Sequence, residues 1–217
     1  MNDMNDLIVH SRARSASSYV LHLLNLNLKG IKSLGEQLRG VPVSSDPHEF
    51  LDSHRKGCRG LCYKILPGYV AKDHYAGLFK KARAVYFVTR SAMDIYISAK
   101  KARLLQTYGG VDTTELSVDF QPTEFLDLTV ELNDHFDKSR IPEGANVIHV
   151  EYDSFFSKTI EARFDFLLKG MGEMRKKNPK EPKGIKQDRS VDRSKQVSNY
   201  SDYRDMIDKY DADYARL

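Results

Sequence analysis

The sequence has no tryptophan, only two cysteines and no long apolar run. Without a stretch of roughly 20 apolar residues it predicts no membrane-spanning helix. Cys58 and Cys62 are four residues apart, and a zinc site there would need histidine ligands from elsewhere in the chain. We therefore expect reduced thiols. The polar, acidic start MNDMND is unlike a secretory signal peptide, so we expect a cytoplasmic protein.

The overall composition is that of a globular protein. With 217 residues, 41% hydrophobic and 29% charged, the chain is predicted to form a single domain over 1–217. A net charge of +4 is too small to predict a specific nucleic-acid partner. The segment at about 172–198 stands out, because nine Lys/Arg and three acids lie between Arg175 and Lys195. It is either a solvated, mobile loop or a cationic flap that closes over an anionic ligand.

Short apolar runs alternate with helical patterns along the chain. The runs are typical of buried parallel strands and lie at 7–9, 61–66, 84–89 and 146–150. Helical apolar faces lie at 20–28, from Ser91 or Asp94 to 105, at 125–136, at 160–168, and after Asn199 or Ser201. This alternation predicts an α/β fold with a central parallel sheet flanked by helices. Ligands of such sheets bind where strands lead into helices, at the carboxyl ends.

The first strand-to-helix junction is the sequence LIVHSRARSASSYVLHLL, from Leu7 to Leu24. It has the outline of a phosphate-binding loop but lacks the Gly-Lys-Ser/Thr ending of nucleotide triphosphatases. The hydroxyl groups, the N–H groups of Ser15 to Ser18 and the Arg14 guanidinium could all donate to an anion. No predicted strand ends in a metal-binding carboxylate, so we expect an anion bound without metal. The alternative is a serine N-cap before an amphipathic helix.

The second junction is YFVTRSAMDIYISAKK. It places Arg90 at a strand end and Ser98 about two turns into the next helix. A guanidinium and a hydroxyl in these positions can hold one phosphate from two sides. The alternative is a local ion pair between Arg90 and Asp94.

Together, these junctions resemble the sulfotransferase superfamily that uses 3′-phosphoadenosine 5′-phosphosulfate. RARSASSY is similar to its 5′-phosphosulfate loop, and FVTR followed by Ser98 is similar to its 3′-phosphate motif. Four further segments resemble family motifs in the right order: SLGEQL, CYKIL, VIHVEYDSFFSK and KQDRSVDRSKQVSNYSDYRDMI. The loop differs from the family pattern at Ala13, where proline is common, and at Ala16, where glycine is usual. Because the chain has no tryptophan, any aromatic side chain that stacks on adenine would be a tyrosine or a phenylalanine.

The resemblance implies a P-loop-like sulfotransferase fold and metal-independent transfer of a sulfuryl group to a hydroxyl or amine acceptor. The implied acceptor is a carbohydrate or a small molecule. The implied donor-binding residues are Arg12, Arg14, Ser15, Ala16, Ser17, Ser18, Arg90 and Ser98, with Lys186 and Arg189 from the basic segment.

Three residues are predicted to act in the transfer itself. Arg14 stabilises the leaving phosphate, Lys64 lines the transfer site from a buried strand, and Glu36 is the base. His48, Glu49 and His54 are alternatives for the base. Two other functions stay open: a non-catalytic nucleotide- or polyanion-binding protein of the same fold, and a P-loop kinase.

Overall fold

In the computed structural model, which describes residues 5–106, 113–182 and 192–214, the chain forms two compact units. Unit 1 comprises Met1–Thr89 and Phe136–Pro182, and unit 2 comprises Arg90–His135 and Lys183–Leu217. Each unit therefore combines segments that are far apart in the sequence. The predicted single domain over 1–217 stays a prediction.

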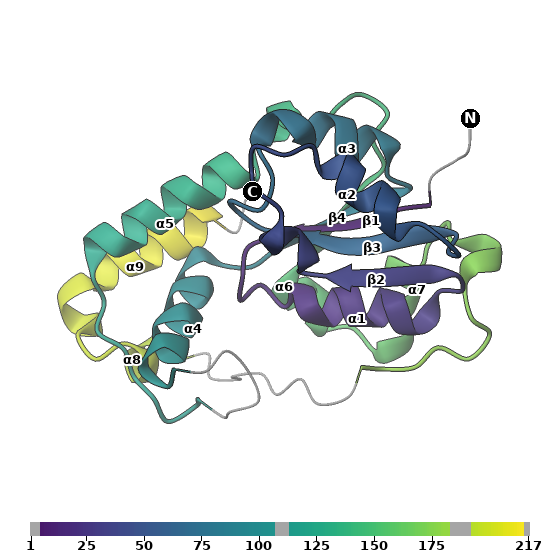
Figure 1. The fold of residues 1–217 in the computed structure, drawn as a ribbon. Coiled ribbons are helices and arrows are strands. Elements are labelled where there is room, and N and C mark those ends of the chain that lie inside the picture. Colours follow the sequence, from purple (N-terminus) through teal and green to yellow (C-terminus); the bar gives the residue numbers. More distant parts are fainter. Residues whose placement is uncertain (1–4, 107–112, 183–191, 215–217) are drawn as a thin grey trace. The chain divides into compact units, whose positions relative to one another are not determined.

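Unit 1 is an α/β unit built on a five-stranded parallel sheet (Figure 1). The strand order is β2-β3-β1-β4-β5, so the first strand lies in the middle. The strands are β1 (Leu7–Ser11), β2 (Ile31–Gly35), β3 (Gly60–Ile65), β4 (Ala84–Thr89) and β5 (Val147–Glu151). The register pairs Val9 with Lys64 of β3 and with Tyr86 of β4. The carboxyl ends of β3 and β4 therefore lie on either side of the loop after β1.

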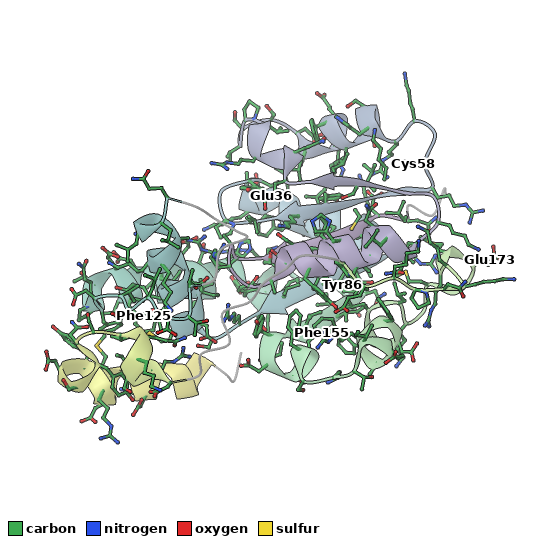
Figure 2. The ribbon with its side chains drawn as sticks, turned by 90° about the horizontal axis from the view of Figure 1, so that it is seen from below. Glu36, Cys58, Tyr86, Phe125, Phe155 and Glu173 are labelled. Carbon is green, nitrogen blue, oxygen red and sulfur yellow. The ribbon has the colours of Figure 1, made fainter. Side chains whose placement is uncertain are left out.

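Alternate residues of the strands enter two separate apolar cores, one on each face of the sheet. Leu7, Val9 and Tyr86 pack with the helices α1 (Ser17–Asn27), α6 (Tyr152–Phe156) and α7 (Ile160–Leu167). Figure 2 labels Tyr86 and Phe155 on this face. Ile8 and Phe87 pack with α2 (Pro47–His54) and α3 (Tyr75–Lys81) on the other face. Because both faces are covered, the strands read as continuous apolar runs.

Short 3₁₀ turns complete unit 1. They are η1 (Gln37–Gly40), η2 (Lys72–His74), η3 (Lys138–Arg140) and η4 (Gly172–Met174). Beyond η4 the chain runs along α1, where the side chain of Asn27 donates to the carbonyl of Lys180 at 2.8 Å and accepts from its N–H. Asn27 is fully buried, so its amide attaches the segment 175–182 to the last turn of α1.

Unit 2 consists of helices around an aromatic cluster. Its helices are α4 (Ala92–Leu104), α5 (Pro122–His135), α8 (Arg193–Gln196) and α9 (Tyr200–Tyr214). Tyr96, Phe120, Phe125 and Tyr203 form the cluster, with successive ring centroids 5.4–5.7 Å apart. Asn199 joins the segment before α5 to the start of α9, because its amide bonds both the N–H and the carbonyl of Phe120.

The predicted α/β class, its parallel sheet and the flanking helices are confirmed. The four predicted strands are β1, β3, β4 and β5, and the five predicted helices are α1, α4, α5, α7 and α9. Strand β2 and helices α2, α3, α6 and α8 were not predicted. β2 (IKSLG) is half polar because it lies at the sheet edge, and the four helices are too short to show a clear period. No helix in the described part of the chain is long and apolar enough to cross a membrane.

Candidate functional site

The loop between β1 and α1 is tightly curled. Arg14 and Ala16 both have left-handed backbones, with φ of 75° and 62°. The Ser15 hydroxyl donates to the Arg12 carbonyl at 2.7 Å and its N–H to the same oxygen at 3.3 Å. Curled backbone of this kind forms anion-binding concavities. Ser15 is fully buried, so its hydroxyl and N–H hold the turn rather than a ligand.

Helix α1 begins at this loop without a side-chain cap. The N-cap residue is Ala16, and no side chain accepts a hydrogen bond there. The alternative of a serine N-cap is therefore wrong. The first N–H groups of a helix have no partner within the helix, and here they belong to Ser17 and Ser18. Ser17 is buried, whereas Ser18 is exposed at the mouth of the loop. Arg12 and Arg14 are half-buried beside it.

Lys64 connects this loop to Glu36. Its ammonium donates to Ser18 Oγ at 2.7 Å and to Glu36 Oε1 at 2.8 Å. The Lys64 side chain is only 4% exposed, whereas that of Glu36 is 46% exposed. The Tyr69 hydroxyl donates to the other carboxylate oxygen, Oε2, at 3.1 Å. The structure thus joins three of the predicted site residues, Ser18, Glu36 and Lys64, in one hydrogen-bonded group.

The hydrogen bond from Lys64 is the main reason that the pKa of Glu36 lies below its ordinary value. The Lys64 charge, the Tyr69 hydroxyl and Arg39 lower this pKa further, whereas partial burial of the carboxyl opposes them. Burial and the neighbouring carboxylate raise the pKa of Tyr69 to about 12. Glu36 is therefore a carboxylate at neutral pH, and Tyr69 is a hydrogen-bond donor.

The alternative bases lie on α2. His48 and Glu49 are in its first turn, and burial lowers the pKa of His48. His54 is its last residue, and Lys32 Nζ at the start of β2 donates to the His54 carbonyl at 3.2 Å. Because β2 begins at the amino-terminal edge of the sheet, His54 lies at the edge opposite the loop. Its ring also contacts the Phe50 carbonyl at 2.8 Å, so His54 is poorly placed as a base.

Two carboxylates stand at the carboxyl ends of strands. Glu36 directly follows β2, and Glu151 is the last residue of β5. Glu151 caps α6, because its carboxylate accepts from the N–H groups of Asp153 and Ser154. Within 5–106, 113–182 and 192–214, no group of three or more His, Cys, Asp or Glu is arranged to hold a metal ion.

Arg90 and Ser98 belong to unit 2. Arg90 precedes α4, whose N-cap is Ser91, and its Nε lies 3.4 Å from Asp94 Oδ2. The local ion pair considered as an alternative is therefore present. Arg193 of α8 pairs with the other oxygen of Asp94. The sequence did not indicate this ion pair, because the two residues are 99 positions apart.

Ser98 is half-buried on α4. Lys186 and Arg189 lie outside the described residues.

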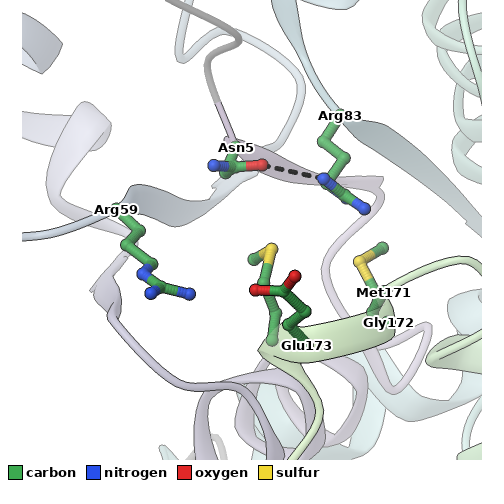
Figure 3. A pocket seen from close by; sticks show the side chains of 7 residues that line it. Asn5, Arg59, Arg83, Met171, Gly172 and Glu173 are labelled. Atoms are coloured by element: carbon green, nitrogen blue, oxygen red, sulfur yellow. Dashed lines mark hydrogen bonds between the residues drawn. The ribbon is translucent and has the colours of Figure 1, made fainter.

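A pocket of about 640 Å³ opens at the amino-terminal edge of the sheet in unit 1 (Figure 3). Asn5, Arg59 and Arg83 precede β1, β3 and β4, and the 3₁₀ turn η4 with Glu173 lies across from them. Arg83 donates to the Asn5 side chain at 2.9 Å and to the Gly170 carbonyl at 2.8 Å. No sequence pattern indicated this pocket. The Glu173 carboxylate makes it less suited to a polyanion than the loop after β1.

Comparisons with known proteins found no matching protein family, no similar curated protein and no similar solved structure. The assignment of function therefore depends on the residues and on their geometry.

Proposed function

We propose that the protein is a metal-independent sulfotransferase. It would transfer the sulfuryl group of 3′-phosphoadenosine 5′-phosphosulfate to a hydroxyl or amine of a carbohydrate or small molecule. The observation that carries this proposal is the hydrogen-bonded group of Ser18, Lys64 and Glu36. It combines an anion-binding loop, a buried cation and a partly exposed carboxylate at the carboxyl ends of neighbouring strands.

The donor binds through its phosphates. The curled loop and the start of α1 supply N–H groups and the positive end of the helix dipole, and Arg12 and Arg14 flank the loop. This set of donors fits the 5′-phosphosulfate. Arg90, which directly follows β4, and Ser98 of α4 are assigned to the 3′-phosphate, with Lys186 and Arg189 as further cations.

The transfer is an in-line displacement at sulfur. A new bond forms between the acceptor oxygen or nitrogen and sulfur, while the bond from sulfur to the bridging phosphate oxygen breaks. The electron pair of that bond remains on the phosphate, so the leaving product is adenosine 3′,5′-bisphosphate. Arg14 and the loop N–H groups stabilise the charge that develops there, and removal of one such donor typically costs about 10²–10³ in rate.

Glu36 takes the proton of the acceptor. Its carboxylate is ionised at neutral pH and nearly half-exposed, so an acceptor can reach it from solvent. Lys64 is buried between the carboxylate and the loop. Its positive charge lies beside the sulfuryl group during the transfer.

A thermal-shift titration with adenosine 3′,5′-bisphosphate tests the proposal. Saturation at about 100 times the dissociation constant should stabilise the protein by roughly 2.7 kcal/mol, and a chelator should not abolish the shift. Labelled donor then tests for turnover, because binding without turnover would indicate a non-catalytic nucleotide-binding protein. A shift seen only with ATP and magnesium would indicate a kinase and would contradict the proposal.

A further inference from the structure

The Lys64 side chain bonds both the anion loop and Glu36. An ammonium has three donors, and two of them are already directed at Ser18 Oγ and Glu36 Oε1. Lys64 lies on strand β3, and its side chain is only 4% exposed. Any anion that settles beside Ser18 therefore comes within reach of the same ammonium.

The anion and Glu36 compete for this one positive charge. In a poorly hydrated position, a charge-assisted hydrogen bond contributes about 1.5–3 kcal/mol, and water cannot readily replace either partner of a buried lysine. A doubly charged phosphate or phosphosulfate is a stronger acceptor than a single carboxylate. Because Glu36 is 46% exposed, its carboxylate can turn to solvent, whereas Lys64 cannot.

We propose that Lys64 is a relay that couples occupancy of the loop to the basicity of Glu36. An anion bound in the loop draws the ammonium toward itself, and the carboxylate is then released to accept a proton. This inference rests on the proposed function, because the donor is the natural occupant of the loop. It implies an ordered reaction in which Glu36 becomes an effective base only after the donor has bound.

Other groups that face Glu36 limit the size of the effect. Tyr69 donates to its second oxygen from the segment after β3, and Arg39 of η1 lies close enough to lower its pKa. Both remain in place when Lys64 moves toward an anion. The released carboxylate is therefore more basic than before but stays hydrogen-bonded and oriented by Tyr69.

A double-mutant cycle measures the relay directly. Binding of two probes, inorganic pyrophosphate and adenosine 3′,5′-bisphosphate, is measured by calorimetry for wild type, Glu36→Gln, Lys64→Met and the double variant. In the wild-type background, Glu36→Gln should tighten binding at least about 5-fold, the lower end of typical coupling between sites. In the Lys64→Met background the same change should have little effect. A simple repulsion between Glu36 and the anion would instead tighten binding equally in both backgrounds, which would overturn the proposal.

A second measurement follows the protonation of Glu36. Carboxyl-carbon NMR of Glu36 should show a pKa that rises when either probe saturates the loop, and this rise should be much smaller in Lys64→Met. Lys32→Met is the matched control, because Lys32 is an exposed lysine of β2 whose ammonium bonds the His54 carbonyl at the opposite edge. It should leave both the affinities and the pKa of Glu36 unchanged.

The two probes separate the two proposals. If pyrophosphate shows the coupling and the nucleotide fails to bind, the sulfotransferase proposal is wrong and the relay stands. If the nucleotide binds and the cycle shows no coupling, the relay is wrong and the proposed function stands. If pyrophosphate binding is insensitive to Arg14→Ala, the loop is not the anion site and the relay is overturned as well.

Discussion

Ala16 has an unfavourable backbone conformation at the centre of the anion loop. A left-handed backbone costs an L-residue about 1–2 kcal/mol, and Ala16 has a φ of 62°. We expect Ala16→Gly to raise the free energy of unfolding by about 0.5–1 kcal/mol, after the extra entropy of glycine in the unfolded chain is subtracted. Urea denaturation measures this change. Ala13→Gly, in the same loop but without a positive φ, should lower stability instead, and a loss in both variants would contradict the assignment of strain to Ala16.

Glu36 is the residue on which turnover depends in the proposed mechanism. Glu36→Gln keeps the size of the side chain but cannot accept a proton, so turnover should fall by about 10²–10⁴ without weaker donor binding. Activity of the wild type should also fall as pH drops through the pKa of Glu36 in the donor complex, because the protonated carboxyl is no longer a base. Slow donor hydrolysis can be followed where no acceptor is known. If His48→Ala abolishes turnover and Glu36→Gln does not, the base is the histidine.

At the scale of the element, the first turns of α4 are assigned to the 3′-phosphate. Arg90→Ala should weaken binding of adenosine 3′,5′-bisphosphate by about 10- to 100-fold, the equivalent of one charge-assisted hydrogen bond, and Ser98→Ala should weaken it less. Neither should affect a nucleotide without the 3′-phosphate. Ser91→Ala is the control, since it removes the N-cap of α4 and should lower stability without changing this discrimination. Equal losses for both nucleotides would mean that Arg90 and Ser98 serve only the fold.

The segment 175–182 is held against α1 by one side-chain amide, that of Asn27. Asn27 is fully buried and bonds both backbone groups of Lys180. Asn27→Ala should lower the free energy of unfolding by about 1–3 kcal/mol, the cost of losing buried polar partners, and should remove the hydrogen-exchange protection of the Lys180 amide. His22→Ala, on the exposed side of the same helix, should change stability by less than about 0.5 kcal/mol. Unchanged protection at Lys180 in Asn27→Ala would show that other contacts hold the segment.

The sequence predicted those elements whose pattern is strong and local. Continuous apolar runs revealed β1, β3, β4 and β5, and the loop after β1 was recognisable from its serines and arginines. The edge strand β2 was missed because one side of it faces solvent. The bonds from Lys64 to Ser18 and Glu36 were also beyond reach, since they join residues 46 and 28 positions apart. The pair of Arg193 with Asp94 depends in the same way on how the chain folds back on itself.

At the scale of the whole molecule, unit 1 has two cores and a complete sheet of its own. Phe136, where the chain re-enters unit 1, has its ring centroid 5.9 Å from that of Phe87 near the end of β4. A Gly-Ser linker of about five residues, which spans about 12 Å, can therefore join Thr89 to Phe136. We expect such a chain, ending at Pro182, to unfold in one cooperative transition by circular dichroism. A non-cooperative transition would mean that the sheet needs residues 90–135 or 183–217 to be stable.

The order of the segments also determines how the sheet is completed during synthesis on the ribosome. β4 is made early, but its partner β5 begins at Val147, about 60 residues later. At 5–20 residues per second, this separation corresponds to about 3–12 s of translation. During that interval the outer edge of β4, with the sequence AVYFVT, has no strand beside it, and unpaired apolar edges readily join other chains. The nascent protein is therefore most exposed to aggregation before β5 emerges, when helices α4 and α5 have already been made.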